Sequence, residues 1–134
     1  MDGLETKASA FGPVETMDRL VAAIEAKGMT VFARIDHAAG AAQAGLVLRP
    51  TALLIFGNAR AGTPLMQEGQ VIGLDLPLKA LVWQDAAHAT WLSYNSPQAL
   101  VARYGLSEAA GPVANAMAAA LTALARAATE LTAP

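Results

Sequence analysis

The chain has 134 residues, which fits one folded domain with a sizeable core. It is 54% hydrophobic and only 15% charged, so we expect a partner, most simply a second copy, to cover some apolar surface. The alternative is that alanine, which adds little exposed area, makes up the excess. The formal charge of -2 and the scattered Lys and Arg residues argue against nucleic acid as a partner.

Cysteine is absent, which excludes disulfides, thiolate catalysis and thiolate metal sites. The N-terminal MDGLETKASA has no apolar run of the kind that marks a signal peptide. No stretch reaches the eighteen or so apolar residues of a membrane span. We therefore expect a single domain over residues 1–134, located in the cytoplasm and without a membrane partner.

The first 28 residues predict a strand followed by a helix. Residues 1–12 are short and mixed, and the Gly12-Pro13 break would end a first strand there. From Glu15 onward, apolar residues recur at helical spacing, and Gly28 stands where a helix would end. The apolar positions of this helix are Met17, Leu20, Val21 and Ile24.

Two strands are predicted next, with a short helix between them. Residues 29–36 alternate with period two, which predicts a strand whose one apolar face carries Met29, Val31, Ala33 and Ile35. Asp36 is placed to cap a short helix in the glycine-interrupted segment that follows. The continuous apolar run over 51–56 (TALLIF) is typical of a central strand buried on both faces.

The following segment predicts a short helix and a hairpin. Thr63 and Pro64 resemble the N-cap and first residue of a helix. Residues 72–83 alternate again, with Pro77 requiring a bulge or an edge position, and residues 90–94 form the returning strand.

Two helices complete the chain. Ser96-Pro97 begins one that Gly105 ends, and a narrow apolar stripe predicts a last helix over 112–132. The order is roughly β-α-β-β-β-β-α with short helical inserts. This order favours an α+β fold with a mainly antiparallel sheet and the long helices packed on one face.

Seven sequence blocks occur in order between residues 15 and 106. They are ETMDRL, VFARIDHAAGA, LRPTALLIFGN, AGTPLMQ, IGLDLPLKALVWQD, TWLSYNSP and LVARYGL. In these blocks the chain resembles the bacterial domain-of-unknown-function family 302, except that Ala59 stands where a proline is common. The resemblance implies an α+β fold and a homodimer, and it implies no established reaction.

A polar group of residues is the candidate site. His37 follows Asp36 at a strand end, where a histidine can bind a ligand or move a proton near neutral pH. The structural alternative is that His37 hydrogen-bonds to the Asn58 loop and fixes the fold. The candidate ligand-binding residues are His37, Asn58, Thr63, Asp75 and Lys79, with an ordinary Asp75–Lys79 ion pair on one strand face as the alternative.

The sequence also bears on the binding of anions, metals and apolar ligands. The GNARAGT segment lacks a nucleotide-loop ending but suits a simple anion at a helix start. The spacing of Asp and His residues predicts no metal site, and the sequence leaves the identity of any cofactor unknown. Met66 with Trp83, Trp91 and Tyr94 either lines an apolar pocket or belongs to the core.

Three functions are compatible with these residues. The first, which we favour, is a dimeric domain that binds or senses a small ligand or anion at the polar group around His37. The second is an enzyme that uses His37 as general acid or base, oriented by Asp36 or Asp75. The third is a protein-interaction or assembly module without a small-molecule site.

Overall fold

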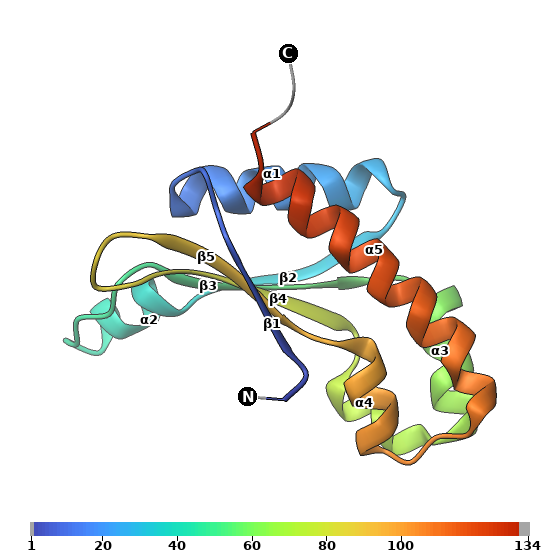
Figure 1. Cartoon of the computed structure of the whole chain (residues 1–134). Helices are drawn as coiled ribbons and strands as arrows, with labels where there is room; N and C mark the ends of the chain where they lie inside the picture. The colour runs from blue at the N-terminus through green and yellow to red at the C-terminus, as the bar shows by residue number, and fades with distance from the viewer. Residues whose placement is uncertain (1, 132–134) are drawn as a thin grey trace.

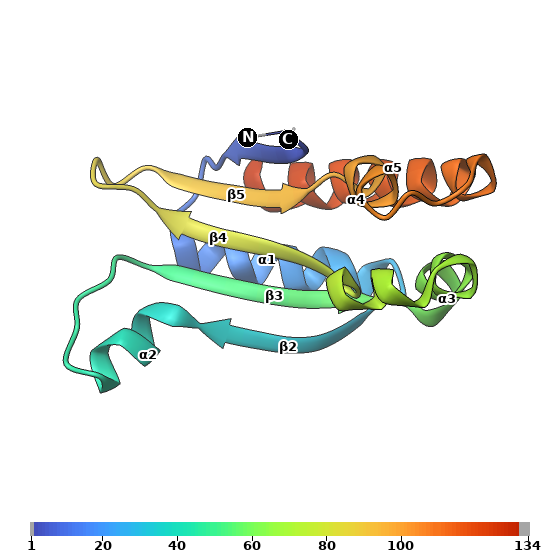
Figure 2. The same cartoon turned by 90° about the horizontal axis from the view of Figure 1, so that it is seen from below.

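Five antiparallel strands form one sheet in the order β1-β5-β4-β3-β2 (Figures 1 and 2). The computed structural model describes residues 2–131. The strands are β1 (Leu4–Ala8), β2 (Thr30–Asp36), β3 (Thr51–Gly57), β4 (Leu78–Gln84) and β5 (Thr90–Asn95). The helices are α1 (Pro13–Ala26), α2 (His37–Gln43), α3 (Ala59–Glu68), α4 (Pro97–Arg103) and α5 (Gly111–Thr129), with 3-10 turns at η1 (Gln70–Asp75) and η2 (Glu108–Ala110).

The two long helices, α1 and α5, cover one face of the sheet (Figure 1). The predicted α+β fold with long helices on one face of an antiparallel sheet is therefore confirmed. The apolar stripes of the helices and alternate strand residues form one core between these layers. Its fully buried members include Met17, Leu20, Ile24, Leu54, Phe56, Val82, Leu92, Leu121 and Leu124. The last helix, predicted over 112–132, forms over Gly111–Thr129 and ends earlier than predicted, because Glu130 has an extended backbone conformation.

The opposite face, called the open face below, carries neither long helix. Figure 2 shows the sheet from this side, with α1 and α5 behind it. Leu53 and Ile55 of β3 point to the open face and are only partly buried, whereas Leu54 and Phe56 are fully buried on the helix side. The run TALLIF thus forms the predicted strand, but this chain alone covers only one of its two faces.

Strand β2 contains a bulge at Phe32, which the alternating sequence pattern does not reveal. Val31 pairs with Phe56, but Ala33 pairs with Ile55, so Phe32 is an extra residue. The expectation of one apolar face from Met29 to Ile35 is therefore wrong. After the bulge, Ala33 and Ile35 lie on the open face, and Arg34 turns toward α1.

Two predicted boundaries are corrected by the structure. The helix expected at Thr63-Pro64 begins at Ala59, because the Asn58 Oδ1 atom accepts a hydrogen bond from the Ala61 N–H at 2.8 Å and caps α3 there. Pro64 lies inside the helix. The strand expected from residue 72 begins at Leu78, since residues 70–75 form η1.

The β4–β5 hairpin turn holds a residue in a conformation that favours glycine. His88 has φ of 64°, the one positive φ among the described non-glycine residues. We expect His88→Gly to raise the free energy of unfolding by about 0.5–1 kcal/mol, because glycine adopts this conformation without the steric cost of a side chain. Urea unfolding tests this, with Ala86→Gly as the control that relieves no strain. A loss of stability in His88→Gly would contradict the prediction.

The Asp85 carboxylate holds the same turn together and gives it a pH dependence. It accepts hydrogen bonds from the Trp91 Nε1 atom at 2.8 Å and from the backbone N–H groups of Ala89 and Ala87. The bond from Trp91 is the main reason why the pKa of Asp85 lies below its ordinary value.

Because folding lowers this pKa, the stabilising contribution of Asp85 is present above the ordinary value, near pH 4. It is lost as the pH falls through the folded-state pKa. We expect Asp85→Asn to lower stability at pH 6 and to make a smaller difference at pH 3. Chemical unfolding of both proteins at the two pH values measures this difference, and an equal difference at both would contradict the assignment.

Candidate ligand-binding site

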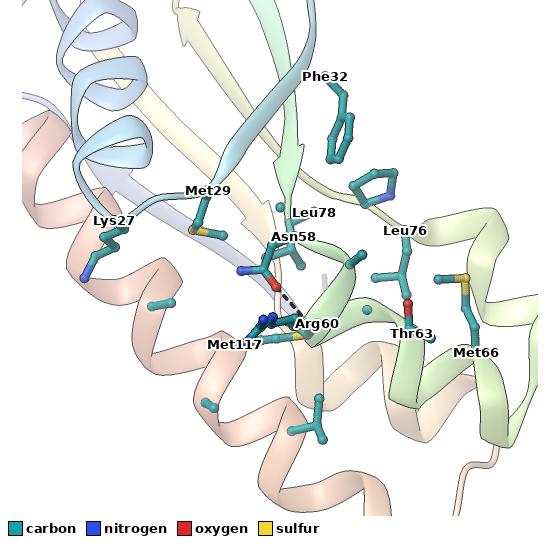
Figure 3. A pocket seen from close by; sticks show the side chains of 18 of the residues that line it. Lys27, Met29, Phe32, Asn58, Arg60, Thr63, Met66, Leu76, Leu78 and Met117 are labelled. Carbon is teal, nitrogen blue, oxygen red and sulfur yellow. Dashed lines mark hydrogen bonds between the residues drawn. The ribbon is translucent and has the colours of Figure 1, made fainter.

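A cavity of about 860 Å³ lies beside the first turns of α3 (Figure 3). Its walls come from the α1–β2 turn, the β2 bulge, α3, the start of β4 and the N-terminal half of α5. The lining residues labelled in Figure 3 are Lys27, Met29, Phe32, Asn58, Arg60, Thr63, Met66, Leu76, Leu78 and Met117. We call this space the α3–α5 cavity.

Small residues leave this space open. Ala61 and Gly62 of α3 line it on one side, and Ala116 and Ala120 of α5 line it on the other. A side chain built at Gly62 would come within 3.8 Å of Leu76 and Met66, which is ordinary contact distance. Because these positions carry little side-chain volume, the two helices lie along a hollow instead of a packed seam.

The rest of the wall is apolar and adaptable. Met29, Met66 and Met117 line the cavity together with Leu76 and Phe32, which is 55% exposed. Methionine is unbranched and polarisable, so it adjusts to ligands of different shape. A concave site of this volume and composition is typical of small-molecule binding sites.

Two cations give the cavity its charge. Lys27 and Arg60 line it and are exposed, and among its described lining residues none carries a carboxylate. Neither cation takes part in an ion pair within residues 2–131. The start of α3, which also favours negative charge, lies at the same place. The cavity is thus apolar inside and positive at its edge.

The structure brings only part of the predicted site together. Asn58 and Thr63 line the α3–α5 cavity. His37 lies at the other end of β2, because Thr30 pairs with Gly57 beside the cavity, whereas Asp36 pairs with Ala52. His37 is exposed and begins α2. The expected contact between His37 and the Asn58 loop is therefore not formed.

Asp36 has a structural task at that distant end. Its Oδ1 atom accepts a hydrogen bond from the Ala39 N–H at 2.9 Å and so caps α2, as the sequence predicted. The carboxylate that the enzyme hypothesis assigned to orienting His37 is therefore engaged with the backbone.

Asp75 and Lys79 also lie outside the cavity, and they do not share a strand. Asp75 belongs to η1 and accepts a hydrogen bond from the Tyr104 hydroxyl, with Arg103 Nη1 at 3.7 Å. The hydrogen bond to Asp75 is the main reason why the pKa of Tyr104 is raised. Lys79 lies in β4 opposite Ile55 and faces the open side of the sheet. The predicted Asp75–Lys79 pair is therefore wrong.

The aromatic residues divide in the same way. Met66 lines the cavity, whereas Trp83 and Trp91 stack on the open face with ring centroids 6.2 Å apart. Tyr94 packs against the core.

Sequence reasoning missed Lys27, Arg60, Ala116 and Ala120 as lining residues. The sequence pattern places Lys27 on the polar face of a helix, which gives no sign of a cavity. The α5 alanines are part of an alanine-rich segment, so they do not stand out in the sequence.

The described residues also bear on two other kinds of site, a membrane span and a metal centre. Across residues 2–131, no helix combines the length and the apolar character needed to cross a membrane. The same residues contain no group of three His, Asp or Glu side chains placed to hold a metal ion.

The fold and much of the sequence match known proteins. A crystal structure of an uncharacterised conserved DUF302 protein from Bacillus stearothermophilus superposes with a TM-score of 0.85 over 96% of this chain and 99% of that one, at 22% identity. A stretch of 104 residues, 78% of this chain, is 49% identical to proteins named fluoride-specific ion channel FluC 1 in Brucella suis and Brucella abortus. The chain spans 41% and 38% of those two proteins, or about two-fifths of their length. The profile of the domain of unknown function DUF302 matches residues 5–124, so the chain belongs to this family.

Proposed function

We propose that this protein is a dimeric binding or sensing domain whose α3–α5 cavity takes a small molecule with an anionic group on an apolar body. The observation that carries the proposal is the cavity itself, with apolar walls and with Lys27 and Arg60 at its edge. Its volume of about 860 Å³ suits a molecule of ten or more heavy atoms. Charged hydrogen bonds from the two cations would fix the anionic group, and the methionines would cover the apolar body.

The similarity to proteins named as fluoride channels suggests fluoride as an alternative ligand. Their names connect a sequence similar to this one with an anion. A bare halide needs close polar donors on several sides, because desolvating an unpaired ion is costly. The apolar walls of the cavity favour an organic anion over fluoride, and sodium fluoride therefore belongs in the test as a competing probe.

A thermal-shift titration with octanoate tests the proposal, with octanol, sodium fluoride and sodium chloride as comparison probes. A ligand that binds only the folded state raises the melting temperature, by an amount that grows with the ratio of its free concentration to its Kd. We expect octanoate to stabilise the wild-type protein more than octanol does, and fluoride to act no differently from chloride. Absence of stabilisation by octanoate would count decisively against the proposal.

Two variants on α5 test whether the cavity is the site. Ala116→Trp places a large side chain in the cavity from an exposed position, so we expect the octanoate effect to disappear. Ala119→Trp is the matched control, because Ala119 is exposed on the same helix and does not line the cavity. Equal octanoate binding by both variants would place the site elsewhere.

The double variant Lys27→Gln/Arg60→Gln tests the charge. We expect it to weaken octanoate binding about tenfold or more while leaving octanol binding nearly unchanged, since each 1.4 kcal/mol is tenfold in affinity. Arg126→Gln, on the exposed side of α5, is the control for loss of one positive charge. His37→Ala is expected to bind octanoate like wild type, because His37 lies at the opposite end of β2.

A further inference from the structure

The open face of the sheet is apolar over its central strands. Leu53 and Ile55 of β3 lie beside Leu81 and Trp83 of β4, and Trp91 of β5 stacks on Trp83. All five side chains are partly exposed. A sheet face that meets water normally carries polar side chains, so an apolar one indicates a covering surface.

The size of this face suits a specific interface. Five strands at the usual spacing, each five to seven residues long, give a patch of roughly 20 by 20 Å. In projection this is about 400 Å² on each molecule, and the accessible area of its side chains is larger, so the face lies near the lower end of the roughly 600–1,000 Å² per partner that specific interfaces bury. Ile35 and Leu4, each 40% exposed, extend the apolar surface toward the two edge strands.

The charges on this face are arranged so that it complements itself. Lys79 is the one ionisable side chain that the five described strands direct to the open face, and within residues 2–131 it has no ion-pair partner. Asp85 follows β4 at its other end, and its carboxylate reaches the Trp91 indole on this face. Six residues of strand separate the two charges by roughly 20 Å. Consider a two-fold axis that lies between the two sheets and crosses β4 at right angles near Val82. This axis brings each Lys79 beside the Asp85 of the other copy.

We propose that two copies of this chain pack through their open faces, antiparallel along β4, with Lys79 of each copy beside Asp85 of the other. The inference rests on the dimer in the proposed function and assigns its interface. In this arrangement the contact is isologous, and Leu81 lies opposite Trp83 of the other copy, with its own counterpart two residues further along the strand. The sheets then lie about 10 Å apart with their apolar side chains between them.

Light scattering over a series of protein concentrations gives the first test. We expect the wild-type chain to have twice the monomer mass of 13.8 kDa. Ile55→Glu places a charge at the centre of the open face and is expected to give the monomer mass. Val14→Glu is the control, because Val14 is an apolar residue of α1 that is already 71% exposed. Circular dichroism establishes that each variant is folded.

Single cysteines give a second test that does not depend on a disruptive substitution. The chain has no cysteine, so Leu81→Cys carries one reactive thiol near the proposed axis. A short bis-maleimide is expected to join Leu81→Cys into a covalent dimer with at least tenfold higher yield than Val14→Cys, whose position lies on α1.

Lys79 tests the register. Lys79→Glu places two like charges together at each end of the interface and is expected to weaken dimerisation about tenfold, whereas Lys79→Met keeps the dimer.

A wild-type monomer at high concentration removes the dimer from the proposed function and this interface with it. A wild-type dimer that keeps its mass in Ile55→Glu and is not cross-linked at Leu81→Cys overturns the interface but leaves the dimer. Equal effects of Lys79→Glu and Lys79→Met overturn the antiparallel register.

Discussion

Replacing Phe56 with alanine is expected to lower the free energy of unfolding by about 3–5 kcal/mol. The Phe56 side chain is fully buried in the core between the sheet and the two long helices. Truncation removes its transfer free energy and leaves a cavity that the surrounding side chains fill only in part. Because domains are typically stable by about 5–15 kcal/mol, the expected loss is a large share of the total. Urea unfolding followed by circular dichroism measures it.

The neighbouring residue on β3 is the matched control. Ile55 points to the open face and is only partly buried within one chain. We expect Ile55→Ala to cost less than Phe56→Ala in dilute protein, and its cost to grow with protein concentration, because dimerisation stabilises the folded state by mass action. Equal, concentration-independent losses at Phe56 and Ile55 would show that the two faces of β3 are equally covered within one chain.

The secure predictions from the sequence rest on local rules that the tertiary structure does not override. The spacing of Met17, Leu20 and Ile24 is a helical period, and these side chains are buried in α1. Ser96 caps α4 by accepting a hydrogen bond from the Ala99 N–H, and Pro97 follows at the first helical position. In such segments the residue types, their period and the end signals all agree.

The sequence predictions are wrong where one local signal competes with another. Asn58 and Thr63-Pro64 both resemble helix starts, and only the structure shows that the Asn58 cap is the one used. In β2 the alternation of apolar residues continues unbroken through Phe32, yet the pairing with β3 shifts there by one residue. A bulge depends on the partner strand, so the pattern of one strand does not reveal it.

The misplacement of the candidate site has a topological reason. His37 and Asn58 follow consecutive strands, and consecutive connections of an antiparallel sheet lie at alternate ends. A strand of seven residues separates those ends by roughly 20 Å. The predicted antiparallel order therefore already indicated that His37 and Asn58 lie apart. The cavity itself was beyond prediction, because it depends on where α5 packs relative to α3.

Replacing Leu121 with alanine is expected to cost about 2–5 kcal/mol of unfolding free energy, since Leu121 is only 2% exposed within the core. The next residue, Thr122, is exposed on the same helix, so Thr122→Ala is the matched control. It removes no core contact and is expected to raise stability by a few tenths of a kcal/mol through helix propensity. Urea unfolding of the two variants measures the difference.

Leu121 also links stability to the proposed site. It lies next to Ala120 and one turn after Met117, both of which line the α3–α5 cavity. If α5 docks through Leu121, then Leu121→Ala loosens one wall of the cavity, and we expect octanoate to stabilise this variant less than it stabilises Thr122→Ala. A contrary result would be a Leu121→Ala protein that has lost several kcal/mol of unfolding free energy but is stabilised by octanoate as fully as Thr122→Ala. Octanoate binding would then not depend on how α5 packs, and α5 would not belong to the binding site.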